Sequence, residues 1–548
     1  MKFLQLSSKQ IFLGITFVVA FCSIVYELIF AHLLNIVFGA TVVQYSLVIG
    51  FFMFALGVGS FAVEYLAKDK TPDEQKVLFI MVEVSITITA ILGAVLILFL
   101  SAFVSQNEFI NIFLEVIGFI PVVLVGFLSG AELPLLVYMY NKDAFTQVLG
   151  TDYFGSLLGT ILYSLVILPA LGIVSTTVFI ASINLFLALL FAIFVYRKHR
   201  TAYTAALFIA LFVASFYFAS SREFNKYIES LYLSKTIENV YAEYGIKNTQ
   251  VYITDILTTP YQQAIEYDIV FEAGSDFANK DHCLNLDRHL QACGNWTESY
   301  HHGLVDVPMS VINKDKLDIL VLGGGDFIPS NFLRRFDDRI NSIDVVDIDA
   351  QFQEFAKKSK FLQKYNQGAY NYPKMHIHVA DAFKYLRTNT KKYDLILFDL
   401  PGIKHDKLLP LYSKEMFSFI FNSLKDDGIF VSWFYPKEMF PKHAKVIENT
   451  LMSAGFKNRL DYVAYNKYKD SVQETEQFFI LPKNQNMQLK INTRANTYTQ
   501  NFKDKYAHLK MYTMQAHPNV AVNSVLYPNT DIIVFKPLVA KLKAYDTQ

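Results

Sequence analysis

Glycines and acidic residues stand at the ends of successive apolar runs in the second half of this chain. The residues concerned are Gly323, Gly324, Gly325, Asp326, Asp347, Asp381 and Asp399. Glycines let a backbone turn approach a ligand closely, and an acid at the end of the next strand accepts hydrogen bonds from ribose hydroxyls. The spacing therefore predicts a nucleoside site in which the three glycines hold the ligand and Asp347 holds its ribose.

Two further acids narrow the choice of nucleoside. Asp381 stands where a carboxylate can accept a hydrogen from an adenine amino group. Asp326 follows the glycines directly, so its charge would repel the carboxylate of S-adenosylmethionine. Decarboxylated S-adenosylmethionine keeps only the amine, which Asp326 attracts. The residues favour this co-substrate, with no separate cofactor and no metal, and argue against an ordinary methyltransferase.

The elements that must position these acids follow from the apolar pattern. Strands are predicted near 317–322, 343–347, 376–381, 393–399 and 428–433. Helical stretches lie between them, and this alternation predicts a parallel sheet with a site at its carboxyl ends. Shorter alternating patterns near 236–300 predict a small antiparallel β lid before that sheet.

The first 220 residues have the composition of membrane helices. Lys and Arg are absent from Gln10 to Ala67, from Val77 to Asn141 and from Asp143 to Tyr196. We place spans near 11–37, 43–65, 77–101, 108–130, 154–171, 174–196 and 203–219. The predicted fold class is thus an α-helical multi-span membrane domain followed by an α/β Rossmann-like, methyltransferase-like domain with a small N-terminal antiparallel β lid.

Three domains are predicted from this division. Residues 1–220 form the membrane domain with about seven transmembrane helices, 221–310 the β lid and substrate domain, and 311–548 the nucleoside-binding catalytic domain.

A net charge of zero argues against nucleic acid as a partner. The three cysteines, Cys22, Cys283 and Cys293, make no metal-binding pattern and are expected to be free thiols. Cys283 and Cys293 could pair only in an oxidising compartment.

The orientation of the membrane domain raises a conflict. If the spans alternate, the basic residues of the connections all fall on the side of the N-terminus, which places that terminus in the cytoplasm. An odd number of spans would then place the soluble part outside. Because a nucleoside co-substrate is made inside the cell, we expect a multi-pass protein of the cell (inner) membrane with its soluble part in the cytoplasm.

Four acids lie within or beside the apolar spans, and none has a basic partner in the same span. They are Glu27, Glu83, Glu115 and Glu132. An ionised carboxylate in hydrocarbon costs about 2.5–3.5 kcal/mol, so such residues usually face a bundle interior or a cavity. We expect these four to converge on a cavity for an organic cation, unless each is protonated or hydrogen-bonded to a neighbouring helix.

With these motifs in place, the chain resembles the spermidine synthase family, specifically its membrane-fused branch. The matching segments of the soluble part are Tyr261-Gln262, Leu286-Asp287, Leu290-Gln291, Glu298-Ser-Tyr-His301, Gly323-Gly-Gly-Asp326, Asp347-Ile-Asp349, Asp381-Ala382 and Asp399. Those of the membrane part are Tyr26-Glu27-Leu28 and Gly130-Ala-Glu-Leu-Pro-Leu135.

The resemblance implies a polyamine aminopropyltransferase that moves the aminopropyl group of decarboxylated S-adenosylmethionine to putrescine or a related amine. Asp399 would be the catalytic base, because a primary amine must lose a proton to become nucleophilic. The implied substrate-binding residues are Tyr261, Gln262, Gln291, Tyr300, His301, Asp326, Asp347, Asp381 and Ala382. Polyamine, nucleoside and lipid bilayer are the expected partners, and a homodimer stays open.

Several positions depart from the family pattern. Gly402 stands where a second Asp is usual, three positions after Asp399, with His405 and Asp406 nearby. Arg288 replaces a Gly, His302 replaces a Glu, and Phe327 follows Asp326 in place of a Gly. The alternative hypothesis is therefore a membrane polyamine transporter or sensor whose soluble domain is catalytically weak or silent.

Overall fold

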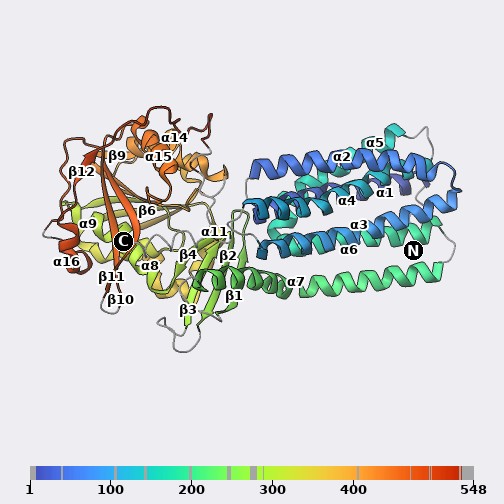
Figure 1. The fold of residues 1–548 in the computed structure, drawn as a ribbon, viewed down its shortest axis with the longest axis horizontal. Coiled ribbons are helices and arrows are strands. Elements are labelled where there is room, and N and C mark those ends of the chain that lie inside the picture. Colours follow the sequence, from blue (N-terminus) through green and yellow to red (C-terminus); the bar gives the residue numbers. More distant parts are fainter. Residues whose placement is uncertain are drawn as a thin grey trace. The chain divides into compact units, whose positions relative to one another are not determined.

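A computed structural model divides the chain into two compact units, Met1–Tyr241 and Ala242–Gln548, which are described separately (Figure 1). The described residues are 8–38, 41–103, 108–140, 145–196, 200–242, 249–271, 280–287, 289–403, 406–468, 471–492, 494, 496–529 and 532.

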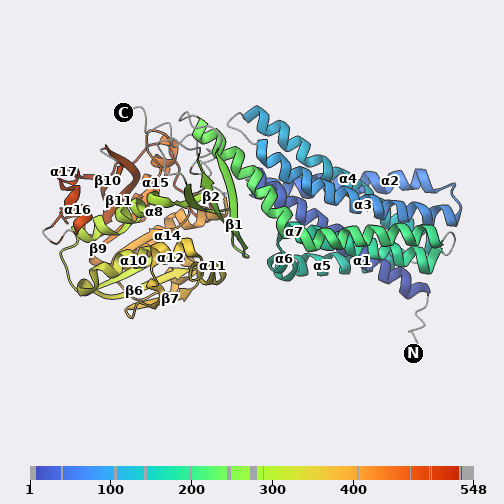
Figure 2. The ribbon, with the colours of Figure 1, turned by 90° about the horizontal axis from the view of Figure 1, so that it is seen from below.

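The first unit is built from long helices that lie side by side (Figure 2). They are α1 (Ser8–Phe38), α2 (Thr41–Ala67), α3 (Pro72–Leu100), α4 (Glu108–Tyr140), α5 (Phe145–Leu162), α6 (Leu168–Phe191) and α7 (Arg200–Ala242). Local sequence signals mark the start of α3. Thr71 and Glu74 form a capping box there, in which each side chain bonds to the backbone N–H of the other. Pro72 occupies the first turn, where the N–H that it lacks would have no partner within the helix.

Glycines let these helices approach closely. A Cβ at Gly59 of α2 would lie 1.9 Å from the carbonyl oxygen of Phe127 in α4, and one at Gly155 of α5 would lie 2.4 Å from that of Phe17 in α1. Small residues at such crossings are typical of helices that pack within a bilayer, where hydrophobic burial gives no drive to association.

Within the described residues, five helices are long and apolar enough to cross a membrane by length and composition, whereas we expected about seven spans. The difference has two sources. The expected spans 154–171 and 174–196 fall mostly within one continuous apolar stretch, Phe145–Phe191. In place of the expected span 203–219, the described part of α7 has a shorter apolar segment, Ala206–Ser215. The stretch of 47 residues is interrupted at Gly172, whose φ of 74° breaks the helix.

The second unit contains two sheets. The smaller is antiparallel, with the order β1 (Gln250–Thr258), β2 (Gln263–Val270), β3 (Lys280–Leu286) and β4 (His289–Cys293). Cys283 and Cys293 stand directly opposite each other in β3 and β4 and form a disulfide, so the expectation of free thiols at these two positions is wrong. Cys22 is free and buried.

The larger sheet has the order β12-β10-β11-β9-β8-β5-β6-β7. Its strands are β5 (Leu317–Gly323), β6 (Ile340–Asp347), β7 (Met375–Val379), β8 (Tyr393–Asp399), β9 (Leu424–Phe434), β10 (Asn458–Tyr468), β11 (Ser471–Pro482) and β12 (Met511–Thr513). β7, β6, β5, β8 and β9 are parallel, and the other three are antiparallel. The sheet is therefore mixed, not parallel throughout as expected.

Helices connect and cover these strands. They are α8 (Gly294–His301), α9 (Val307–Val311), α10 (Ile328–Leu333), α11 (Ala350–Ala356), α12 (Lys360–Asn366), α13 (Ala382–Thr388), α14 (Lys414–Ser423), α15 (Pro441–Ser453), α16 (Thr497–Asn501) and α17 (Lys503–Tyr506). β5 and β8 are almost entirely buried, as strands covered on both faces must be. The strand order reverses between β5 and β8, where open α/β sheets bind their ligands.

Candidate active site

The ends of β5 and β8 meet at this reversal point, so the glycine turn and Asp399 are neighbours. Gly323 pairs with Asp399 in the sheet, and a Cβ on Gly323 would lie 2.1 Å from the carbonyl oxygen of Asp399. Gly323 and Gly324 have φ values of 85° and 71°, which favour glycine. The turn therefore needs these glycines for its own geometry as well as for access by a ligand.

Three titratable groups converge beyond the turn. One ligand atom each from His301, Asp326 and Asp399 lies within 4.8 Å of the others. Burial raises the pKa of Asp326 to about 8, and the charges of Asp399 and Asp347 add to this rise. Burial also raises the pKa of Asp399 to about 6, with a further contribution from Asp347. Close to pH 7 the acids therefore retain about one proton, which a bound cation would displace.

Tyr300, which lies in α8, hydrogen-bonds to Asp399. Its hydroxyl donates a hydrogen bond to Oδ1 of Asp399 at 2.8 Å, which lowers the pKa of that carboxyl against the effect of burial. Burial, Asp399 and Glu476 together raise the pKa of Tyr300 well above its ordinary value, so the phenol keeps its proton. Among the described residues, the bond from Tyr300 is the side-chain hydrogen bond that Asp399 accepts, and it occupies one of its two carboxylate oxygens.

His301 presents an unprotonated nitrogen to the same site. Its ring Nδ1 lies 2.7 Å from the carbonyl oxygen of Thr297, which fixes Nδ1 as the donor. Burial lowers the pKa of His301 to about 3, so the ring is neutral at pH 7. Among the described residues its buried Nε2 has no hydrogen-bond partner. This lone pair and the two carboxylates can hold either an ammonium group or a metal ion.

Asp347 ends β6 beside the glycine turn. Its carboxylate accepts the backbone N–H of Gly325 at 3.2 Å and that of Asp349 at 2.8 Å. Asp349 in turn accepts hydrogen bonds from Thr259 at 2.6 Å and from Gln262 at 3.2 Å. The small sheet is thus hydrogen-bonded to the loop that follows β6, and Gln262 contacts Asp349 in that loop.

The remaining predicted site residues lie at different distances from this centre. Asp381 follows β7 and caps α13, accepting the N–H of Lys384 at 2.8 Å. Ala382 is buried as the first residue of that helix. Gln291 is half-buried in β4 and makes no hydrogen bond within the described residues. Tyr261 is 47% exposed, and the structure does not bring its ring to the acids.

Gly402 lies against aromatic side chains. A Cβ there would stand 2.3 Å from the Tyr435 hydroxyl and 2.7 Å from the Trp433 ring. Tyr412 donates a hydrogen bond to the carbonyl of Pro401 at 2.9 Å, and Trp433 to that of Leu400 at 3.2 Å. These aromatic residues therefore hold the loop and fill the space that a second carboxylate at 402 would need.

Glu476 is a candidate residue that the sequence motifs missed. It precedes Gln477, whose partner Phe434 is the last paired residue of β9 and stands directly before Tyr435. Phe478 lies on the same face of β11 and contacts Tyr300 at 5.4 Å between ring centroids. Glu476 raises the pKa of both Tyr300 and Tyr435. It is half-buried and makes no hydrogen bond or ion pair among the described residues.

The other departures have structural explanations where the structure describes them. His302 stacks on Tyr498 at 4.1 Å between ring centroids and hydrogen-bonds to the buried Asp306, so it faces away from the acids. Phe327 adopts a left-handed conformation with a φ of 63° and buries its ring completely. Arg288, His405 and the side chain of Asp406 lie outside the described residues.

The four acids expected to converge within the helical unit do not form one described cluster. Glu83 and Glu132 are buried, and their side chains are close enough to interact. Glu115 instead accepts a hydrogen bond from Gln44 at 2.6 Å. Glu27 is mostly buried, with no described contact to the other three. The expected convergence is thus limited to Glu83 and Glu132.

Comparison with known proteins places the chain among relatives of one kind. Residues 297–468 match the family model described as "Spermine/spermidine synthase domain". "Polyamine aminopropyltransferase 2" of Aquifex aeolicus is 29% identical over 449 residues, covering 80% of this chain and 82% of that protein. "Polyamine aminopropyltransferase" of Oceanobacillus iheyensis is 26% identical over 422 residues, covering 75% of each chain.

Proposed function

We propose, from the premise that this chain carries a spermine/spermidine synthase domain, that it is a polyamine aminopropyltransferase. The observation that carries the proposal is the convergence of Asp326, Asp399 and His301 at the reversal point of the sheet. Acids at this point suit a cationic donor and a cationic acceptor, whereas a donor with a carboxylate would be repelled.

The donor in this proposal is decarboxylated S-adenosylmethionine. The glycine turn lets the backbone approach it, Asp347 faces its ribose and Asp381 its adenine. Its amine lies against Asp326, which gives up its proton when the ammonium binds. No step requires a cofactor, although His301, Asp326 and Asp399 are also a reasonable set of metal ligands.

The transfer step is a displacement at carbon. Asp399 takes a proton from the acceptor's ammonium, and the freed nitrogen attacks the methylene carbon bonded to the sulfonium. A carbon–nitrogen bond forms as the carbon–sulfur bond breaks, and its electron pair stays on sulfur as a neutral thioether. Tyr300 keeps Asp399 in position through its hydrogen bond. Because a sulfonium leaves readily, placement and deprotonation account for most of the catalysis.

The acceptor is putrescine or a related amine, and its far end lies beyond Asp399. Gly402 offers no charge there, but Glu476 stands beside Tyr300 and Tyr435 on the neighbouring strand. A carboxylate without a cation among the described residues suits the second ammonium of a diamine. Trp433 and Tyr435 supply aromatic surface near Gly402 for the methylene chain between the two nitrogens.

The test is product analysis with purified full-length protein. The protein is incubated with decarboxylated S-adenosylmethionine and a panel of polyamines, with and without a metal chelator, and products are identified by mass spectrometry. The expected result is an acceptor heavier by one aminopropyl group, insensitive to chelator and absent with Asp399→Asn. No product from any amine, or methyl transfer from S-adenosylmethionine, would contradict the proposal.

A further inference from the structure

The direction of each helix in the first unit follows from which residues face each other. Gly155 and Gly159 of α5 face Phe17 and Ile24 of α1 in the same order, so these two helices are parallel. Gly126 and Gly130 of α4 face Phe52 and Leu56 of α2 in the same order, so α2 and α4 are parallel as well.

Other contacts show which helices run in opposite directions. Gly93 of α3 faces Pro121 of α4, and Gly118 of α4 faces Leu100 of α3, so α3 and α4 are antiparallel.

α3 and α6 are antiparallel as well. Asn184 of α6 donates to the carbonyl of Glu83 in α3, and Phe191 contacts Phe79. Phe30 of α1 faces Gly93 of α3, and Leu33 lies with Leu98 in one pocket, so α1 is parallel to α3. Direction thus alternates from α1 to α6. At about 1.5 Å per residue, Phe145–Phe191 would extend about 70 Å, more than twice a hydrocarbon core of about 30 Å. The break at Gly172 therefore divides it into two crossings.

The last helix continues the alternation. Tyr203, near the start of α7, contacts Tyr196 after α6 at 5.7 Å between ring centroids. Tyr217, further along α7, lines a pocket with Leu33, Leu98 and Val174. Leu33 and Leu98 lie near the C-terminal ends of α1 and α3, and Val174 near the start of α6. α7 is thus parallel to α1 and leaves the bundle at the end opposite to the start of α1.

The helix termini at the end of the bundle where α1 starts are flanked in the sequence by basic residues. These are Lys2, Lys9, Lys68, Lys70, Lys76, Lys142, Arg197, Lys198 and Arg200. The connections at the other end, 39–40, 101–107 and 168–173, contain no Lys or Arg. The excess of basic residues places the start of α1 in the cytoplasm. Arg222 and Lys226 follow the last apolar segment, but long domains cross membranes largely regardless of charge.

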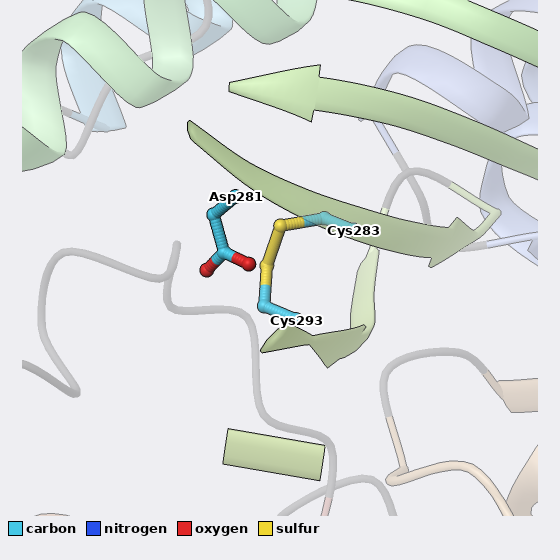
Figure 3. Close-up of side chains that lie close together, drawn as sticks. All are labelled: Asp281, Cys283 and Cys293. Atoms are coloured by element: carbon cyan, nitrogen blue, oxygen red, sulfur yellow. A yellow bond between two sulfur atoms is a disulfide. The ribbon is translucent and has the colours of Figure 1, made fainter. Parts of the chain in front are cut away.

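A disulfide in the second unit independently indicates whether this unit lies in an oxidising or a reducing compartment. Cys283 and Cys293 are joined across β3 and β4, with Asp281 beside them (Figure 3). Sulfurs in a disulfide are not thiolate ligands, so this group is not a metal site. Disulfides persist in oxidising compartments and are rare in the cytosol. The bond also braces β4 directly before α8, the helix that carries Tyr300 and His301.

From the helix directions, the basic residues and the disulfide together, we infer that the unit 242–548 lies on the outer, oxidising face of the membrane. This reverses the cytoplasmic placement that nucleoside chemistry favoured. One consequence rests on the proposed function: a donor bearing a sulfonium and an ammonium does not cross lipid unaided. A carrier-mediated export reaction must then supply the cationic nucleoside to this enzyme, and its thioether product is released outside.

Single introduced cysteines test the placement in intact cells with a membrane-impermeant maleimide. Leu526→Cys reports on the second unit, because Leu526 is 81% exposed, and Lys70→Cys on the opposite end of the bundle. Wild-type protein gives the background from buried Cys22. We expect Leu526→Cys to be labelled at once and Lys70→Cys only after permeabilisation. The reverse pattern, or labelling of both in intact cells, overturns the inference.

A second measurement determines whether Cys283 and Cys293 are disulfide-bonded in the cell. Cells are quenched in acid, denatured and treated with a maleimide that adds visible mass to each free thiol. Wild type should gain one adduct before reduction and three after it, whereas a Cys283→Ser/Cys293→Ser variant should gain one in both cases. Three adducts before reduction overturn the inference. Neither experiment depends on transfer activity, so their failure is distinct from failure of the proposed function.

Discussion

Binding of the donor should expel about one proton from the site at pH 7. With the pKa of Asp326 at about 8 in the free protein, about nine-tenths of the molecules carry a proton there at pH 7. An ammonium placed against Asp326 favours the ionised form, so the bound state gives that proton up. Isothermal titration in two buffers of different ionisation enthalpy measures the number released.

The same displacement makes affinity depend on pH with a defined sign. The ionised fraction of Asp326 rises from about 0.09 at pH 7 to about 0.5 at pH 8, so the Kd should fall about fivefold over that interval. Methylthioadenosine lacks the amine and is a matched control with no release. Asp326→Asn should remove both the release and the slope. Equal release with both nucleosides, or a flat Kd, would refute the reasoning.

Three further variants test the rest of the site. Asp399→Asn should lower single-turnover transfer about 100-fold or more, with the nucleoside Kd changed less than about threefold; equal losses in both would move the base elsewhere. Glu476→Gln should raise the KM for putrescine about tenfold with little change in kcat, while the exposed Glu474→Gln should not, and equal effects would count against a diamine contact. Gly402→Asp should melt earlier than Gly402→Asp/Tyr435→Phe, because overpacking against the Tyr435 hydroxyl costs about 1–3 kcal/mol; identical melting of the two variants would show that the loop shifts to make room.

Local sequence carried enough information to predict that Asp326, Asp347 and Asp399 lie near one another beside a glycine turn. Asp326, Asp347 and Asp399 each follow a strand that is buried on both faces, and such strands read as unbroken apolar runs. Parallel strands end at one edge, so acids far apart in sequence were expected together. The run of glycines was also a local signal, because it predicts a turn that needs positive φ angles, and Gly323 and Gly324 have them.

Glu476, which we propose contacts the acceptor, could not be predicted from local strand patterns. Glu476 lies on an antiparallel strand, and β11 carries one extra residue between Gln477 and Glu474 opposite Val463 to Tyr465 of β10. A bulge of this kind redirects side chains without a sequence signature. The part of the sheet beyond β9 was missed for a related reason, since pairing partners of antiparallel strands depend on register and not on run length.

The disulfide had a signal that was given too little weight. The alternating patterns near 236–300 predicted an antiparallel lid, and Cys283 and Cys293 stand opposite each other on neighbouring strands of it. From the sequence, we treated pairing only as a matter of an oxidising compartment. We did not ask whether the lid would bring the two cysteines together.

Charge balance indicates how the site can hold two cations without being blocked by either. Asp326, Asp347 and Asp399 carry at most three negative charges, and the free site reduces this by keeping a proton. A donor with an ammonium and a sulfonium replaces that proton and nearly neutralises the cluster. The acceptor's ammonium then meets Asp399 beside a fixed positive charge, which lowers the pKa of the acceptor nitrogen and eases its deprotonation. The far ammonium, held by Glu476 away from the sulfonium, keeps its charge, so one end of the diamine is made nucleophilic while the other stays anchored.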